Sequence, residues 1–107
     1  MVVQFINCSP GQYDALGEYA RVLEAAQDDI ILETGRNDGN LYTEANKGTT
    51  ICYAHGKCTQ DITSQQCSNC LRAVRIAMNR ECRNSIGAHC KVGSCEFRYE
   101  EYEFDDG

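Results

Sequence analysis

The sequence has no run of apolar residues approaching the ~20 that a membrane-spanning helix requires, so we expect no membrane span. It also lacks an excess of basic residues: 10 Lys and Arg stand against 16 Asp and Glu, which gives a formal net charge of −6. That balance argues against nucleic-acid binding and against disruption of anionic membranes by a cationic helix. No internal repeat, linker or low-complexity segment interrupts the 107 residues, so a single domain over residues 1–107 is predicted.

A secretory leader is absent as well. Met1 precedes the short run VVQFIN, with neither a basic segment nor a long apolar stretch. The eight cysteines nevertheless indicate secretion, because an even number at this density in a short chain is typical of a disulfide framework made in an oxidising compartment. We therefore expect a mature secreted, extracellular chain that carries an added initiator Met.

Zinc is the competing interpretation of the cysteines, and it needs a motif that the sequence has only in part. Cys67 and Cys70 form one C-x2-C pair. The second pair of a zinc ribbon is missing, since Cys82, Cys90 and Cys95 are separated by 8 and 5 positions, and the chain has only 2 histidines. Disulfides are favoured, and neither a metal nor another cofactor is expected.

The stretch Cys58–Cys70 leads into the strongest helix signal of the chain. Thr63 is followed three positions later by Gln66, the signature of a capping box, and a helix is predicted over Ser64–Glu81. The apolar residues of this helix recur with helical spacing, so one face of it should be buried. That face consists of Cys67, Cys70, Leu71, Val74, Met78 and Cys82.

A first helix is predicted from Tyr13 to around Gln27–Asp29, because apolar residues recur there with helical period. The run Ile30–Leu32 either extends this helix or packs as an irregular segment. Runs of β-prone residues predict strands at 2–8, 41–44, 49–54, 89–92 and 96–103. The elements together predict an α+β domain in which two helices pack on an antiparallel sheet.

The last predicted strand has two distinct faces. Phe97 and Tyr99 share one of them, and Glu96, Arg98 and Glu100 share the other, because successive side chains of a strand alternate. The acidic tail EYEFDDG that follows is expected to be a solvated terminus, since chain ends usually fray.

Three motifs resemble those of one family. C-x8-C-x2-C spans Cys58–Cys70, N-x-I-G-A spans Asn84–Ala88, and F-x-Y-E spans Phe97–Glu100. Together they resemble the ginkbilobin-homologous domain, also called the plant stress-antifungal domain of cysteine-rich secretory proteins, over nearly the whole chain. The resemblance implies two α-helices on a five-stranded antiparallel sheet, crosslinked by disulfides. The pairs it implies are Cys8–Cys82, Cys58–Cys67 and Cys70–Cys95.

Two cysteines, Cys52 and Cys90, have no counterpart in the family's six-cysteine pattern. One falls in the second strand of the predicted hairpin and the other in the strand after the long helix. We predict a fourth, cross-strand disulfide between them, because unpaired thiols are unusual in a secreted domain. The alternative is a pair of buried free cysteines.

The resemblance also suggests a carbohydrate site. The family's founding member resembles a mannose-binding lectin whose sugar contacts are an Asn, an Arg and a Glu. At the matching positions this sequence has Ser9, His89 and Glu100, so only the carboxylate is kept. A carboxylate accepts hydrogen bonds from sugar hydroxyls, and a guanidinium donates to them in fixed geometry. Arg98, on the same strand face as Glu100, is the candidate for the missing guanidinium, and His89 would make binding pH-dependent.

The predicted function is a secreted plant defence protein with antifungal activity in the apoplast, acting as a monomer. The leading ligand is mannose or a fungal cell-wall glycan. The alternative is a protein-recognition module with an extracellular protein partner, for which Tyr99, Tyr102 and Phe104 are candidate contact residues. An enzyme using Glu100 with Glu103 or Asp105 is not expected, because a terminal strand in so small a domain offers little cleft.

Overall fold

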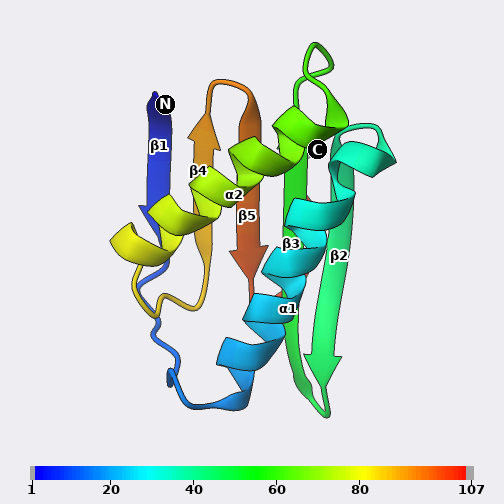
Figure 1. Cartoon of the computed structure of the whole chain (residues 1–107). Coiled ribbons are helices and arrows are strands. Elements are labelled where there is room, and N and C mark those ends of the chain that lie inside the picture. The colour runs from blue at the N-terminus through cyan, green and yellow to red at the C-terminus, as the bar shows by residue number, and fades with distance from the viewer. Residues whose placement is uncertain (1, 106–107) are drawn as a thin grey trace.

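The computed structural model describes residues 2–105, which form a five-stranded antiparallel sheet with two α-helices on one face (Figure 1). The strands follow each other in the sheet as β1-β4-β5-β3-β2, so the last strand of the chain lies in the middle. Their bounds are β1 (Val3–Cys8), β2 (Asn40–Lys47), β3 (Thr50–Cys58), β4 (Ala88–Val92) and β5 (Cys95–Glu100). The predicted α+β architecture is confirmed.

The second helix, α2 (Ser64–Glu81), has the predicted bounds. Its start is fixed by the predicted capping box. Thr63 Oγ1 accepts a hydrogen bond from the backbone N–H of Gln66 at 3.1 Å, and Gln66 Oε1 accepts one from the backbone N–H of Thr63 at 2.8 Å. Two backbone donors that a helix start leaves open are thereby satisfied.

The first helix, α1 (Glu18–Glu33), begins later and ends later than predicted. Asp14 Oδ1 accepts from the backbone N–H of Leu16 at 2.9 Å, and this local turn keeps the preceding residues out of the helix. At the other end Ile30 and Ile31 continue the buried stripe, so the ambiguous run Ile30–Leu32 belongs to the helix. Across residues 2–105 neither α-helix reaches the length and apolarity that a transmembrane helix requires.

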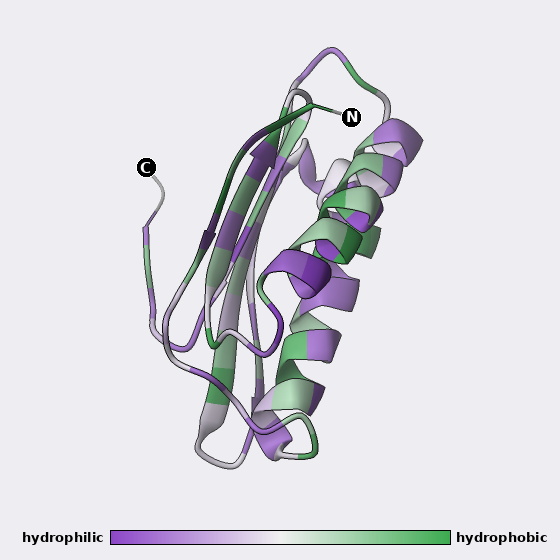
Figure 2. Cartoon of the chain, turned by 90° about the vertical axis from the view of Figure 1, so that its left-hand side faces the viewer, coloured by the Kyte–Doolittle hydropathy of each residue, from purple (hydrophilic) through white to green (hydrophobic). Residues whose placement is uncertain are grey.

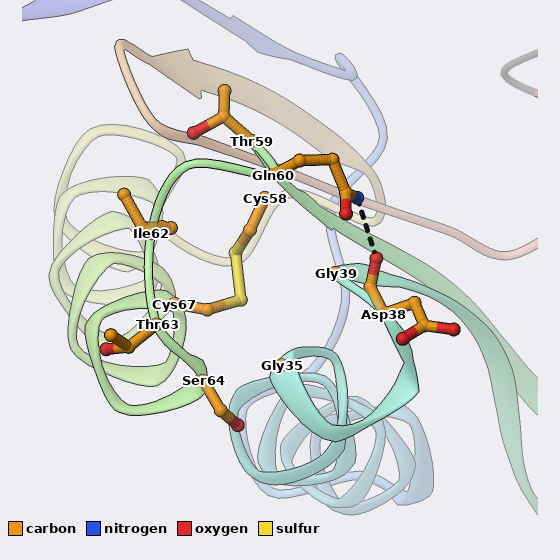
Figure 3. A pocket seen from close by; sticks show the side chains of 10 residues that line it. All are labelled: Gly35, Asp38, Gly39, Cys58, Thr59, Gln60, Ile62, Thr63, Ser64 and Cys67. Atoms are coloured by element: carbon orange, nitrogen blue, oxygen red, sulfur yellow. Dashed lines mark hydrogen bonds between the residues drawn. A yellow bond between two sulfur atoms is a disulfide. The ribbon is translucent and has the colours of Figure 1, made fainter.

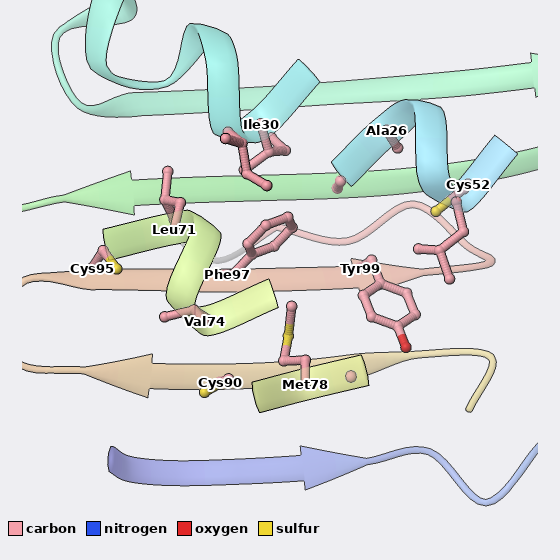
Figure 4. Close-up of a cluster of buried hydrophobic side chains, with 14 of the residues drawn as sticks. Ala26, Ile30, Cys52, Leu71, Val74, Met78, Cys90, Cys95, Phe97 and Tyr99 are labelled. Carbon is pink, nitrogen blue, oxygen red and sulfur yellow. The ribbon is translucent and has the colours of Figure 1, made fainter. Parts of the chain in front are cut away.

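The core lies between the helices and the sheet, with α1 over β2 and β3 and α2 over β4 and β5 (Figures 1 and 4). Phe97 and Tyr99 of β5 point into it, as their strand alternation predicted, and both are fully buried. At Gly56 of β3 the sheet approaches α1 closely, because a Cβ there would come within 2.5 Å of Ile30 Cγ2. The buried cluster between the helices and the sheet includes Ile30, Leu71, Val74 and Met78.

The three disulfides that the resemblance implied are confirmed. Cys8–Cys82 ties β1 to the end of α2, with a Cα–Cα distance of 5.3 Å. Cys58–Cys67 joins the end of β3 to the first turn of α2, and Cys70–Cys95 anchors α2 to the start of β5.

The fourth disulfide, between Cys52 and Cys90, is a wrong prediction: both are buried free cysteines. Cys52 lies in β3 and Cys90 in β4, and β5 runs between these strands. Two strand spacings put their backbones at least about 9.5 Å apart, beyond the ~7 Å that a disulfide can bridge. Phe97 is the register partner of Cys90, and Figure 4 shows Phe97 and Tyr99 between the two sulfurs.

Candidate functional site

The side of the sheet that faces away from both helices (Figure 2), here called the open face, carries three of the four residues predicted for the sugar site. Arg98 and Glu100 of β5 project onto it, as the alternation of the strand predicted. The strand registers place His89 of β4 and His55 of β3 directly opposite Arg98, one on each side. The middle of the open face is therefore a row of basic side chains across three strands.

The structure brings Ser9 and Glu100 together at Gly87. The backbone N–H of Ser9 donates to the carbonyl of Gly87 at 2.9 Å. A Cβ on Gly87 would lie 1.9 Å from Glu100 Oε1 and 2.8 Å from Ser9 Oγ. Two of the residues predicted for the sugar site thus meet over a glycine that leaves room for them.

Arg98 supplies a guanidinium beside Glu100, as predicted. Its Nε donates to Glu100 Oε2 at 2.9 Å. The Glu100 side chain keeps only 8% of its accessible surface and that of Arg98 20%. A charge-assisted hydrogen bond at low exposure holds both groups in place, but it also occupies one oxygen of the carboxylate.

His89 is turned toward a different carboxylate. Its Nε2 lies 2.5 Å from Glu96 Oε2, and its ring packs at right angles to the ring of Phe5 with centroids 4.9 Å apart. The four predicted residues therefore form two separate groups on the open face. Arg98 and Glu100 make one, with Ser9 at its border, and His89 makes the other with Glu96.

Residues 101–105 of the acidic tail are exposed except for Phe104, whose packing on the open face corrects the prediction of a purely solvated terminus; residues 106–107 lie outside the described part of the chain. Beyond β5 the chain turns back and runs along the open face (Figure 2). The ring of Phe104 lies over the Arg98 guanidinium, with 4.1 Å between Cζ and the ring centroid. It also packs on the ring of Tyr42 at 5.0 Å, and its backbone N–H donates to the Tyr42 hydroxyl at 3.0 Å. Arg98 is thus covered by the chain itself.

Sequence reasoning missed Tyr42 as a residue of this site. Its position in β2 is an outward one, and strand alternation could have shown that much. That it shares Phe104 with Arg98 depends on the order β5-β3-β2, which no local signal contains. Tyr99, in contrast, is not an exposed contact residue: it is fully buried on the helix side, where its hydroxyl donates to the carbonyl of Ser85 at 3.0 Å.

A pocket of about 180 Å³ lies at the opposite end of the molecule from Ser9, where α2 begins (Figure 3). The Cys58–Cys67 disulfide crosses it, and Gln60 Nε2 closes one side by donating to the carbonyl of Asp38 at 2.9 Å. Among its ten described lining residues Asp38 carries the one charge. Apart from the disulfide, Ile62 is the one apolar side chain among these lining residues, so the hollow lacks the mainly apolar walls that are typical of a small-molecule site.

Comparison with known proteins places the chain in a family. The family model described as salt stress response/antifungal matches residues 7–102. Cysteine-rich receptor-like protein kinase 25 of Arabidopsis thaliana is 35% identical over 78 residues, which are 71% of this chain and 12% of that protein. Antifungal protein ginkbilobin-like protein 1 of Picea sitchensis is 34% identical over 55 residues, which are 51% of this chain and 41% of that protein. Putative cysteine-rich repeat secretory protein 10 of Arabidopsis thaliana is 39% identical over 61 residues, 57% of this chain and 24% of that protein.

Solved structures show the same fold. The tandem DUF26 ectodomain of the Arabidopsis thaliana cysteine-rich receptor-like protein PDLP8 superposes with a TM-score of 0.87 at 19% identity, over 96% of this chain and 50% of that one. The corresponding ectodomain of PDLP5 gives a TM-score of 0.86 at 18% identity, over 95% of this chain and 51% of that one. The chain thus spans half of each tandem ectodomain, and 12% and 24% of the two Arabidopsis relatives named above. Its family match, its fold and its three disulfides agree, and the chain belongs to the salt stress response/antifungal family as a ginkbilobin-like domain.

Proposed function

We propose that this domain is an extracellular recognition module of plant stress or defence, secreted to the apoplast, and that it binds its ligand on the open face of the sheet. The family description supports the biological setting. So do the names of its relatives, which include a receptor-like kinase, a secretory protein and an antifungal protein. We expect the domain to act as a monomer without a cofactor.

The observation that carries the proposal is the rigid display of aromatic and basic side chains on the open face. Tyr42 and Tyr102 are 42% and 53% exposed there, beside an Arg98 whose position is fixed by Glu100 and Phe104. Tyrosine and arginine are the residue types that dominate binding energy at protein interfaces. Side chains already held in place lose little conformational entropy when a partner binds. The geometry therefore favours an extracellular protein as the ligand.

Mannose or a fungal cell-wall glycan is the second candidate ligand, and one observation favours it. Ser9, Glu100 and Arg98 come together at one end of β5 and include the acceptor and the donors that a sugar site needs. Because Glu100 is largely covered and already bonded to Arg98, a sugar would reach only the exposed edges of these groups. Affinity in the millimolar range is expected, since exposed polar contacts contribute little net energy.

No catalytic activity is part of the proposal. A glycosidase needs two carboxyl groups that face each other across a cleft. One of the two must be free to act as nucleophile or base. Glu100, the carboxylate at the end of β5, is held by Arg98 and closed against Gly87. A carboxylate that is already held by a hydrogen bond from Arg98 supports a binding role for Glu100.

A growth assay on fungal hyphae tests the recognition function with a matched pair of variants. Tyr42 and Ile76 are both large and exposed, but they lie on the open face and on α2 respectively. Y42A should raise the concentration needed for half-inhibition by about tenfold, the effect of losing one interface anchor. I76A should inhibit as the wild type does. Equal potency of all three proteins would refute the open face as the working surface, and an inactive wild type would refute the antifungal role.

An amide-shift NMR titration with mannose and with a mannan oligosaccharide separates the two ligand classes. Saturable shifts at Ser9, Arg98 and Glu100 would establish the carbohydrate function. The absence of shifts at tens of millimolar sugar would exclude mannose and leave a protein partner as the ligand.

A further inference from the structure

The place where Phe104 rests has the properties of a peptide-binding site. We call it the Phe104 seat, and it consists of the Arg98 guanidinium and the ring and hydroxyl of Tyr42. The ring of Phe104 is held from two sides, by a cation–π contact at 4.1 Å and by the Tyr42 ring at 5.0 Å. The backbone N–H of Phe104 is bonded to the Tyr42 hydroxyl at 3.0 Å. Recognition of an aromatic ring together with its own backbone N–H is specific to a polypeptide.

A row of unpaired cations lies next to the seat on the open face. Lys57 of β3 and Lys91 of β4 both stand opposite Glu96 of β5 in the strand registers. The carboxylate of Glu96 is bonded to His89, and within residues 2–105 the side chain of neither lysine has a hydrogen bond or an ion pair. The two lysines line a hollow of about 100 Å³ beside the turn that joins β4 to β5. Two basic side chains are thus available to an anionic ligand on a protein whose net charge is −6.

The tail has the complementary chemistry. Phe104 lies between Glu103 and Asp105, and Glu101 precedes them. Glu100 ends β5, yet Phe104 lies over Arg98, two residues back along the strand, so the tail runs toward the lysine row. A bound segment that continues in this direction would advance about 3.3 Å per residue, so an acidic residue two positions beyond its aromatic ring would reach that row.

We propose that the open face binds an extended segment of a partner protein in which an aromatic residue is flanked by acidic ones, and that the tail Tyr102–Asp105 is a tethered competitor for the same seat. This rests on the proposed recognition function and names its partner class. The partner's aromatic residue replaces Phe104 on Arg98 and Tyr42, and its acidic residues pair with Lys57 and Lys91. The short tether keeps the local concentration of the tail in the millimolar range. A partner must therefore bind tightly enough to displace the tail, or bind when the tail has already left the seat.

The test uses the full chain and a synthetic acetylated peptide, Glu-Tyr-Glu-Phe-Asp-Asp, that copies the tail sequence. F104A empties the seat without touching the core, because Phe104 lies beyond β5 and is absent from the buried cluster. The peptide should bind F104A with saturable amide shifts at Tyr42 and Arg98. It should bind the wild-type protein at least about tenfold more weakly, because there it must displace the tethered tail.

Three controls define the site more sharply. A peptide with Ala in place of its Phe should lose binding to F104A. Adding K57A and K91A to F104A should weaken peptide binding by about tenfold. It should also make the affinity less dependent on salt, because salt screens the attraction between the lysines and the acidic residues of the peptide. Adding Y42F to F104A keeps the ring and removes the acceptor for the backbone N–H, and should weaken binding by a smaller factor.

Two results would overturn the proposal. One is the absence of peptide shifts on F104A at millimolar peptide, and the other is equal peptide affinity for F104A and the wild type. If trigalacturonate shifts Lys57 and Lys91 while the peptide gives no shifts, the first of these results holds and the face is assigned to an acidic glycan. The hyphal assay reports on the recognition function separately, because a wild-type protein that inhibits growth supports that function whatever the peptide does.

Discussion

Gly87 and Glu100 approach so closely that no side chain fits between them: a Cβ on Gly87 would lie 1.9 Å from Glu100 Oε1. Gly87 lies just before β4 and Glu100 ends β5, so this contact closes one end of the open face. The carboxylate is held in this position by Arg98 Nε at 2.9 Å. The glycine of the I-G-A motif is thus required by the glutamate of the F-x-Y-E motif.

The first prediction concerns G87A. The added methyl group must push the Glu100 carboxylate away from Arg98, and losing a hydrogen bond between charged groups costs about 1.5–3 kcal/mol of unfolding free energy. Urea unfolding followed by circular dichroism measures this loss. G93A is the matched control, because a Cβ on Gly93 meets nothing within 4 Å, and it should change stability by less than about 0.5 kcal/mol.

A double-mutant cycle identifies the cause of that loss. In an E100A background the methyl group of G87A has no carboxylate to displace, so the two substitutions should be strongly non-additive. If G87A costs the same in both backgrounds, the strain lies elsewhere and the assigned contact is wrong.

The second prediction is that Cys52 and Cys90 resist labelling until the protein unfolds. Both side chains are fully buried, and burial raises the pKa of Cys52 to about 11 and that of Cys90 above its usual value. Only the thiolate reacts with iodoacetamide, so the native protein at about pH 8 should take up no label. In concentrated guanidinium without reductant it should take up two labels, as counted by mass spectrometry. If the unfolded, unreduced protein takes up no label, Cys52 and Cys90 are joined by a disulfide and the assignment of two free thiols is wrong.

The contrast between α2 and the Cys52–Cys90 pair shows which parts of the structure a sequence reveals. The bounds of α2 were predicted correctly because the capping box and the apolar stripe are local patterns. A disulfide between β3 and β4 requires those strands to be neighbours, and the order β4-β5-β3 is decided by tertiary packing. The three confirmed disulfides came from the family resemblance, which carries that tertiary information.

The candidate site likewise has features that the sequence predicts and features that depend on tertiary packing. Strand alternation correctly put Arg98 and Glu100 on one face and Phe97 and Tyr99 on the other. It could not show that Phe104 folds back over Arg98, because the contact with Tyr42 joins positions 62 residues apart in the sequence. Likewise the binding of His89 to Glu96 rather than to the Arg98–Glu100 pair depends on side-chain conformations that the sequence does not specify.

The third prediction tests the start of α2. T63A removes the oxygen that accepts from the backbone N–H of Gln66, and loss of such a cap costs about 1 kcal/mol. T59A removes a similar side chain from an exposed loop position where the backbone N–H alone is bonded, to the carbonyl of Ser94 at 3.0 Å. It should therefore be nearly neutral. Thermal unfolding of both variants measures the difference, and equal melting temperatures would show that the capping box does not stabilise the fold.

The fourth prediction is a loss of stability at alkaline pH. Burial raises the pKa of Tyr19 and Tyr99 above the usual value for tyrosine, and it raises the pKa of Cys52 to about 11. In the unfolded chain the thiol ionises near pH ~8.5 and the phenols near pH ~10. Above these values the unfolded chain has released protons that the native protein still holds, so the free energy of unfolding falls as pH rises. The contribution of these groups to the free energy of unfolding is fully present below about pH 8.5. Above that pH the free energy of unfolding decreases by up to about 1.4 kcal/mol per pH unit for each group that has ionised only in the unfolded chain.

Urea midpoints measured between about pH 8 and pH 11 give this slope. Y19F removes a phenol whose hydroxyl lies 3.6 Å from Cys52 Sγ and donates to the carbonyl of Ile86 at 2.7 Å, so it should lower stability at pH 8 but flatten the alkaline slope. C52A should flatten the slope as well, and it removes a thiolate that could exchange with the disulfides. A wild-type midpoint that stays constant over this range would contradict the assignment of buried protonated groups between α1 and the sheet.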